Sequence, residues 1–163
     1  MILRSFISVD LLTIATIFLL NACSEQKKDV VKVSKSVQPS ITIQSFSKLP
    51  PEIDGCNCIF SRNEKDLKDG KFIFTSSMEN NIAYMTINDS LVKFKLKSSG
   101  TEPNTFTNFN HKEVFFNNDY IITIDVKHIK NADSEVWVDK GTITIVRKDG
   151  QKLITKFYGE CGC

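Results

Sequence analysis

The chain has 163 residues, of which 41% are hydrophobic and 25% charged, with 21 basic and 19 acidic side chains and a net charge of +2. This near balance lacks the basic excess typical of DNA- or RNA-binding proteins, so no nucleic-acid partner is expected. The length is sufficient for one domain that buries a hydrophobic core.

The first 22 residues have the pattern of a signal peptide. Arg4 precedes the apolar run 11–20, which is shorter than the roughly 20 apolar residues of a membrane-spanning helix. The run leads into residues 20–23, with the sequence LNAC, which resemble the lipobox of bacterial lipoproteins. The resemblance implies removal of residues 1–22 and lipidation of Cys23.

Lipidation would make a membrane the first partner of the mature protein, held through acyl chains on Cys23. Ser24 stands where inner-membrane retention signals have Asp. The resemblance therefore implies an outer-membrane lipoprotein of a Gram-negative bacterium, facing the periplasm or the cell surface. Two alternatives are a secreted protein with a free Cys23 and an anchor that is never cleaved.

Residues 23–51 are expected to form a flexible tether. The segment 24–35 is rich in Lys, Ser and Glu and has no hydrophobic period, and prolines at 39, 50 and 51 interrupt the remainder of the tether. The alternation in residues 41–46 is compatible with an early strand, so the tether is predicted to end between that segment and residue 52.

Residues 52–163 are predicted to form one β-domain. Hydrophobic residues alternate with polar ones, or cluster in short runs, at 72–74, 82–87, 92–96, 122–126, 142–146 and 153–158. Turn-forming residues separate these runs at 88–90, 117–119 and 148–150. Such short connections join neighbouring antiparallel strands. The expected fold is all-β, a small antiparallel barrel or sandwich of about seven to eight strands, with one helical turn within 62–68.

The chain has five cysteines, and four remain once Cys23 is assigned to lipidation. Four is an even number, so all of them can pair. The other four are Cys56 and Cys58 near the start of the domain, and Cys161 and Cys163 at its end. Alternate residues of a strand share a face, so each pair presents two sulfurs together. Antiparallel terminal strands would join Cys56 to Cys163 and Cys58 to Cys161, whereas parallel strands would exchange the partners.

Two other chemistries are open to these four sulfurs. As thiolates they could bind a soft ion such as copper(I) or zinc, although structural zinc sites usually have two to four residues between paired cysteines. A solvent-accessible thiol of lowered pKa could instead carry out disulfide exchange. The oxidising environment outside the cytoplasm favours two structural disulfides, with no cofactor.

The chain has no Gly-x-Ser-x-Gly elbow, phosphate-binding loop, His-Glu-x-x-His or zinc-deaminase motif, and the prediction is that the protein is not an enzyme. His111 and His128, the two histidines, are interpreted as solvent-facing residues of a strand or loop. The polar segment 133–135 is interpreted as a plain turn.

The longest irregular stretch is residues 98–110, which contains Phe106 and Phe109 among polar residues. Loops of this length are uncommon unless they are functional or disordered. The two phenylalanines are therefore candidates for a partner-binding site, with packing against the domain as the alternative.

Two resemblances bear on the domain. Trp137 and the following Asp139-Lys140-Gly141 resemble a short segment of β-barrel lipoprotein inhibitors of lysozyme, in which a turn precedes a late strand; Trp137 is then a core residue, and no inhibitory residue is carried over. The opening at 54–58 and the ending at 158–163 resemble uncharacterised small Gram-negative lipoproteins with paired Cys-x-Cys ends. The resulting prediction is a non-catalytic binding or envelope-interaction module, with a soft-metal-binding lipoprotein as the alternative.

Overall fold

The computed structural model describes residues 39–101 and 110–163. In chain order its elements are β1 (Ile43–Gln44), β2 (Asn57–Ser61), α1 (Glu64–Lys68), β3 (Phe74–Ser77), β4 (Ile82–Ile87), β5 (Ser90–Thr101), β6 (His111–Phe116), β7 (Tyr120–Asn131), β8 (Val136–Arg147) and β9 (Lys152–Gly162). The predicted all-β class is confirmed.

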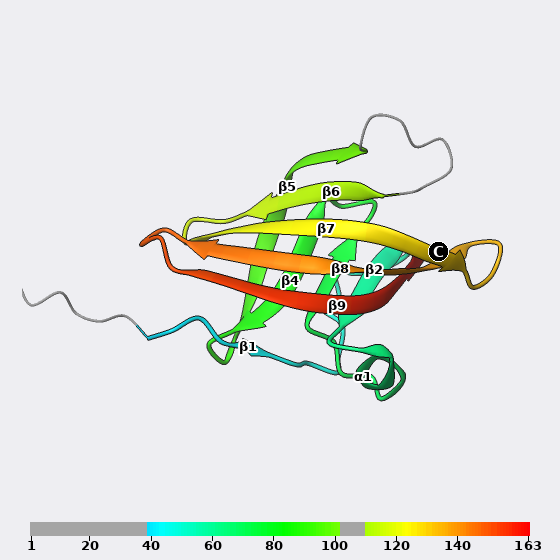
Figure 1. Ribbon diagram of the computed structural model, residues 1–163, viewed down its shortest axis with the longest axis horizontal. Coiled ribbons are helices and arrows are strands. Elements are labelled where there is room, and N and C mark those ends of the chain that lie inside the picture. Colours follow the sequence, from blue (N-terminus) through cyan, green and yellow to red (C-terminus); the bar gives the residue numbers. More distant parts are fainter. Residues whose placement is uncertain (1–38, 102–109) are drawn as a thin grey trace, which may run out of the picture. The chain divides into compact units, whose positions relative to one another are not determined.

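Eight of the strands close into an antiparallel barrel. Their order is β4-β3-β2-β9-β8-β7-β6-β5, and β5 pairs with β4 as well as with β6, which closes the ring. β1 is an additional strand that pairs with the end of β4. The structure thus decides between the two predicted architectures in favour of the barrel. Figure 1 shows β7, β8 and β9 side by side, with the C-terminus and the β7–β8 turn at the same end of the barrel.

Alternate residues of the long strands fill the interior. On β7 the inward residues include Ile122 and Ile124, and on β8 Ile143 and Ile145, all of them 0% exposed. These residues face one another across the register of the two strands. Period-two alternation in the sequence therefore corresponds to an inward and an outward face of the barrel wall.

Aromatic rings complete the core and lie over glycines. The Phe60 ring stacks on Phe157 at 4.0 Å and on Phe74 at 5.4 Å between centroids. A Cβ atom on Gly159 would lie 2.3 Å from Cδ1 of Phe60, and one on Gly141 would lie 2.8 Å from Cε1 of Phe157. Glycine at these inward positions leaves the space that the rings occupy.

The packed part of the chain begins before residue 52, where the tether was expected to end. Ile41 and Ile43 are 6% and 8% exposed and belong to the core cluster. Further toward the N-terminus, the Pro39 carbonyl accepts a hydrogen bond of 2.9 Å from Nη1 of Arg147. The possible early strand at 41–46 is β1, so its alternation reflects burial and not a tether.

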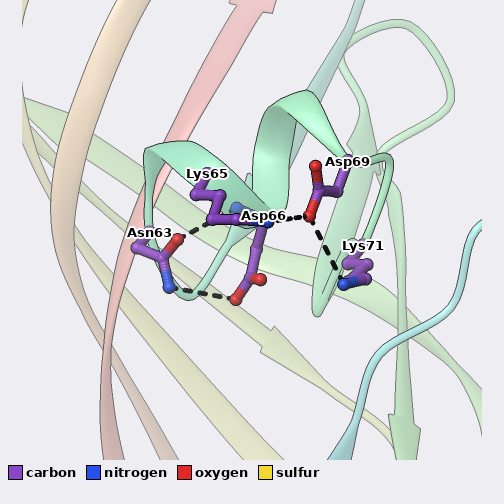
Figure 2. Close-up of polar contacts among 5 residues, drawn as sticks. All are labelled: Asn63, Lys65, Asp66, Asp69 and Lys71. Carbon is purple, nitrogen blue, oxygen red and sulfur yellow. Dashed lines mark hydrogen bonds and ion pairs between the residues drawn. The ribbon is translucent and has the colours of Figure 1, made fainter.

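The predicted helical turn is α1, and local polar contacts define both of its ends. Oδ1 of Asn63 accepts a hydrogen bond from the Asp66 backbone N–H at 2.9 Å, which caps the N-terminus. Asp69 follows the last helical residue and pairs with Lys65 at 2.6 Å and with Lys71 at 3.4 Å (Figure 2). These residues are largely exposed, so the pairs contribute little to stability.

Two predicted breaks in the strand pattern are wrong. The turn expected at Lys140-Gly141, before the next strand, is absent, because β8 runs without interruption from Val136 to Arg147. The irregular stretch expected from residue 98 begins later, because β5 continues to Thr101 with a register shift between Leu96 and Ser98. In both places backbone pairing with a neighbouring strand overrides the local turn preference of Gly, Ser and Asp.

No helix of the described residues is long and apolar enough to cross a membrane.

Candidate functional site

The two Cys-x-Cys pairs join the first and last strands of the barrel. Cys58 on β2 lies directly opposite Cys161 on the antiparallel strand β9. Disulfides connect Cys58 to Cys161 and Cys56 to Cys163. This is the connectivity expected for antiparallel terminal strands, and it confirms the predicted disulfide bonds.

All four sulfurs of these pairs are bonded to one another. Within residues 39–101 and 110–163, no three His, Cys, Asp or Glu side chains are placed to hold one metal ion. The soft-metal hypothesis therefore stays a prediction for the reduced protein.

Several polar side chains of β6, β7 and β8 face the barrel interior at the same end as the disulfides. Directly across the sheet, Trp137 lies opposite Cys161, and Asp139 lies opposite His128. Opposed residues of an antiparallel pair point to the same face. We call this end of the interior the barrel mouth; its defining residues are Cys58, His111, Glu113, His128, Trp137, Asp139 and Cys161.

The barrel mouth contains two adjacent hollows. One, of about 260 Å³, has Glu113, Leu96, Phe115 and the Cys58–Cys161 disulfide among its walls. The other, of about 380 Å³, is lined by residues that include His128 and Val136. Trp137, His111 and Ser99 line both hollows. A concave space with apolar walls and a few polar groups is the usual form of a ligand site.

The most buried polar group of the mouth is the carboxyl of Asp139. Nδ1 of His128 lies 3.2 Å from Oδ1 of Asp139, and the two side chains are 15% and 1% exposed. Oδ2 of Asp139 has no hydrogen-bond partner in the described part of the chain. Burial raises the pKa of Asp139, and the hydrogen bond from His128 opposes that rise.

Glu113 is the second inward carboxyl, opposite the fully buried Ile124. Burial raises the pKa of Glu113, and the nearby His111 lowers it by a smaller amount. The charged form of Glu113 is thus less stable in the folded protein than in the unfolded chain.

We expect Glu113→Gln to stabilise the protein at pH 8. Because the folded-state pKa of Glu113 is raised, its ionisation weakens folding above that pKa, and the effect disappears below the unfolded-state value of about 4.3. The gain of the variant over the wild type should therefore shrink as the pH falls from 8 to 4, as urea unfolding would show. Glu160→Gln changes an outward-facing glutamate of β9 and is the matched control. A Glu113→Gln protein that is no more stable than the wild type at pH 8 would contradict this expectation.

The interpretation of the two histidines as solvent-facing residues is wrong. His128 continues the inward series of Ile124 and Val126 on β7, and His111 lies opposite Val126, which is 1% exposed. Every second residue of β7 points inward, and this alternation was visible in the sequence. It could have placed the His128 side chain inside the barrel. Glu113 was not recognised from the sequence because its strand, β6, was not predicted.

Of the remaining residues for which a role was predicted, the structure describes Trp137 and the segment 133–135 but not the others. Trp137 packs against the core cluster, as predicted, but it is only partly buried and also lines both hollows. The segment 133–135 lies in the β7–β8 turn, where Oδ1 of Asp133 accepts a hydrogen bond from the Ser134 N–H. Cys23, Phe106 and Phe109 lie outside the described residues.

No protein-family model matches the chain, and neither the curated proteins nor the solved structures include a significant match to it.

Proposed function

We propose that the protein is an exported lipoprotein, anchored in the outer membrane through Cys23, whose barrel is a non-catalytic binding module. The observation that carries this proposal is the pair of disulfides between β2 and β9. Disulfides of this structural kind persist in oxidising compartments and are rare in the cytosol. They support the export that the apolar run and the residues LNAC at 20–23 imply.

The barrel mouth supports a binding role. It combines a hollow of about 260 Å³ with a buried carboxyl, a partly buried carboxyl and an indole ring. Polar groups held inside a barrel cost folding free energy unless they are compensated, and this cost is commonly found at functional sites. The module would face the periplasm or the cell surface and bind an envelope component or an extracellular ligand there.

Replacement of Cys23 tests the anchor. With the full chain expressed in a Gram-negative host, the wild type should incorporate labelled fatty acid and sediment with outer membranes. Cys23→Ala should lose the label to background, because the thioether can no longer form, and should no longer sediment with membranes. The double variant Cys56→Ala/Cys163→Ala, which removes cysteines but keeps Cys23, should retain the label. Equal labelling of the wild type and Cys23→Ala would refute the proposed anchor.

A further inference from the structure

Two carboxyl groups face the barrel mouth, and among the described residues neither forms an ion pair with a lysine or arginine. Asp139 is 1% exposed, and Oδ2 has no hydrogen-bond partner among the described residues. Glu113 faces the same interior from β6, two strands away. Among the ion pairs of the described residues, none joins either carboxyl to a lysine or arginine. Glu113 lines the smaller hollow, so a cation entering it would meet a carboxylate that no lysine or arginine of the described residues neutralises, with the buried Asp139 behind the wall.

The walls of the mouth determine which kind of cation fits. Trp137 lines both hollows, and an indole face is the best aromatic surface for a positive charge. Leu96, Phe115 and the Cys58–Cys161 disulfide supply apolar walls beside it. A bare metal ion requires several ligands at one point, and no such group of three exists among the described residues. Apolar walls next to a carboxylate and an indole favour a cation with a hydrocarbon body.

We propose that the barrel mouth binds a small organic cation, with its ammonium group over Trp137 and toward Glu113 and Asp139, and its hydrocarbon part against Leu96 and Phe115. This inference rests on the proposed role as a binding module and assigns that role a site and a ligand class. The imidazoles of His111 and His128 lie in the same site. Burial raises the pKa of both Glu113 and Asp139, so acid neutralises these carboxylates and the cation should bind more weakly at pH 5 than at pH 8.

Tryptophan fluorescence reports on this site directly, because Trp137 is the only tryptophan of the chain. The full-length oxidised protein, purified in a maltoside detergent, would be titrated with choline at pH 8 while tryptophan fluorescence is recorded. The matched probe is 3,3-dimethylbutan-1-ol, which has the shape of choline without its charge. We expect a saturable response to choline and at least about a tenfold weaker affinity for the neutral probe.

Two variants test whether the fluorescence response comes from choline bound in the barrel mouth. Glu113→Gln should weaken choline binding at least about fivefold, since it removes a carboxylate that faces the cavity. Glu160→Gln, the same change on the outward face of β9, should leave binding unchanged. Because Glu113→Gln is expected to be more stable than the wild type at pH 8, a loss of binding would not reflect unfolding. Equal responses to the two probes, no response to choline, or unchanged binding by Glu113→Gln would each overturn the proposal.

A lipid headgroup carries the same quaternary ammonium as free choline, and a parallel titration with phosphatidylcholine vesicles separates the two sources. A response to free choline supports the proposed site, whereas a response confined to vesicles would overturn it in favour of membrane contact. The outcome is independent of the anchor. Choline binding without fatty-acid label at Cys23 would refute only the lipoprotein proposal, and label without choline binding would refute only the cation site.

Discussion

Breaking both disulfides should lower the free energy of unfolding by about 4 to 5 kcal/mol, whereas breaking the outer bond alone should cost less than about 2 kcal/mol. The bonds close loops with sequence separations of 107 and 103. In the chain-entropy model either bond alone restricts the unfolded chain almost as much as the two together. Once one bond is formed, the second closes only a small additional loop. The stabilisation by both bonds together is therefore much smaller than the sum of the values for each bond alone.

Urea unfolding of three samples would measure this effect. They are the wild type, the variant Cys56→Ala/Cys163→Ala, and the wild type kept reduced. The outer pair is suited to substitution because Cys163 is exposed, whereas Cys58 and Cys161 are 8% and 2% exposed, so alanine there would also leave a cavity. If the outer-pair variant were as unstable as the reduced protein, the inner bond would not provide the closure assigned to it.

Phe60→Ala should destabilise the folded barrel by about 3 to 5 kcal/mol. Phe60 is 1% exposed and stacks on both Phe74 and Phe157. Its ring also fills the space above Gly159, which has no side chain to replace it. Truncation would therefore remove a large apolar surface and leave a cavity between β2, β3 and β9 that the neighbouring backbone cannot readily fill.

Thermal and urea unfolding of the oxidised protein would measure the loss. The matched control is Phe116→Ala, because Phe116 is 40% exposed on the outer surface of β6 and its truncation should cost less than about 1 kcal/mol. A loss at Phe60 no larger than that at Phe116 would show that the aromatic stack is not the centre of the core.

Local periodicity accounts for the part of the fold that could be predicted. Residues 92–96 and 122–126 alternate with a period of two, and in the structure Phe94 and Ile124 point inward while Lys93 and Lys95 are exposed. The class of the fold can be deduced from such patterns because a strand's two faces are determined by the sequence of that strand alone. The pairing of the cysteines could be deduced in the same way once the terminal strands were antiparallel.

The barrel mouth could not be predicted from such local patterns. His128 and Asp139 are 11 residues apart in sequence, and they meet because the register of β7 and β8 places them opposite each other. Glu113 reaches the same interior because the register of β6 and β7 places it opposite the inward-facing Ile124. Register and closure depend on how whole strands pack, and the sequence around any one residue does not contain that information.

By itself the sequence determined the β class, the inward and outward faces of the strands that cover residues 92–96, 122–126 and 142–146, and the two partners available to each of the four paired cysteines. The tertiary structure alone decided that the sheet closes into a barrel, that β8 continues through Gly141, and that two carboxyls lie inside. The physical reason is that strand faces depend on alternation between adjacent residues, whereas closure and the mouth depend on contacts between residues far apart in the chain.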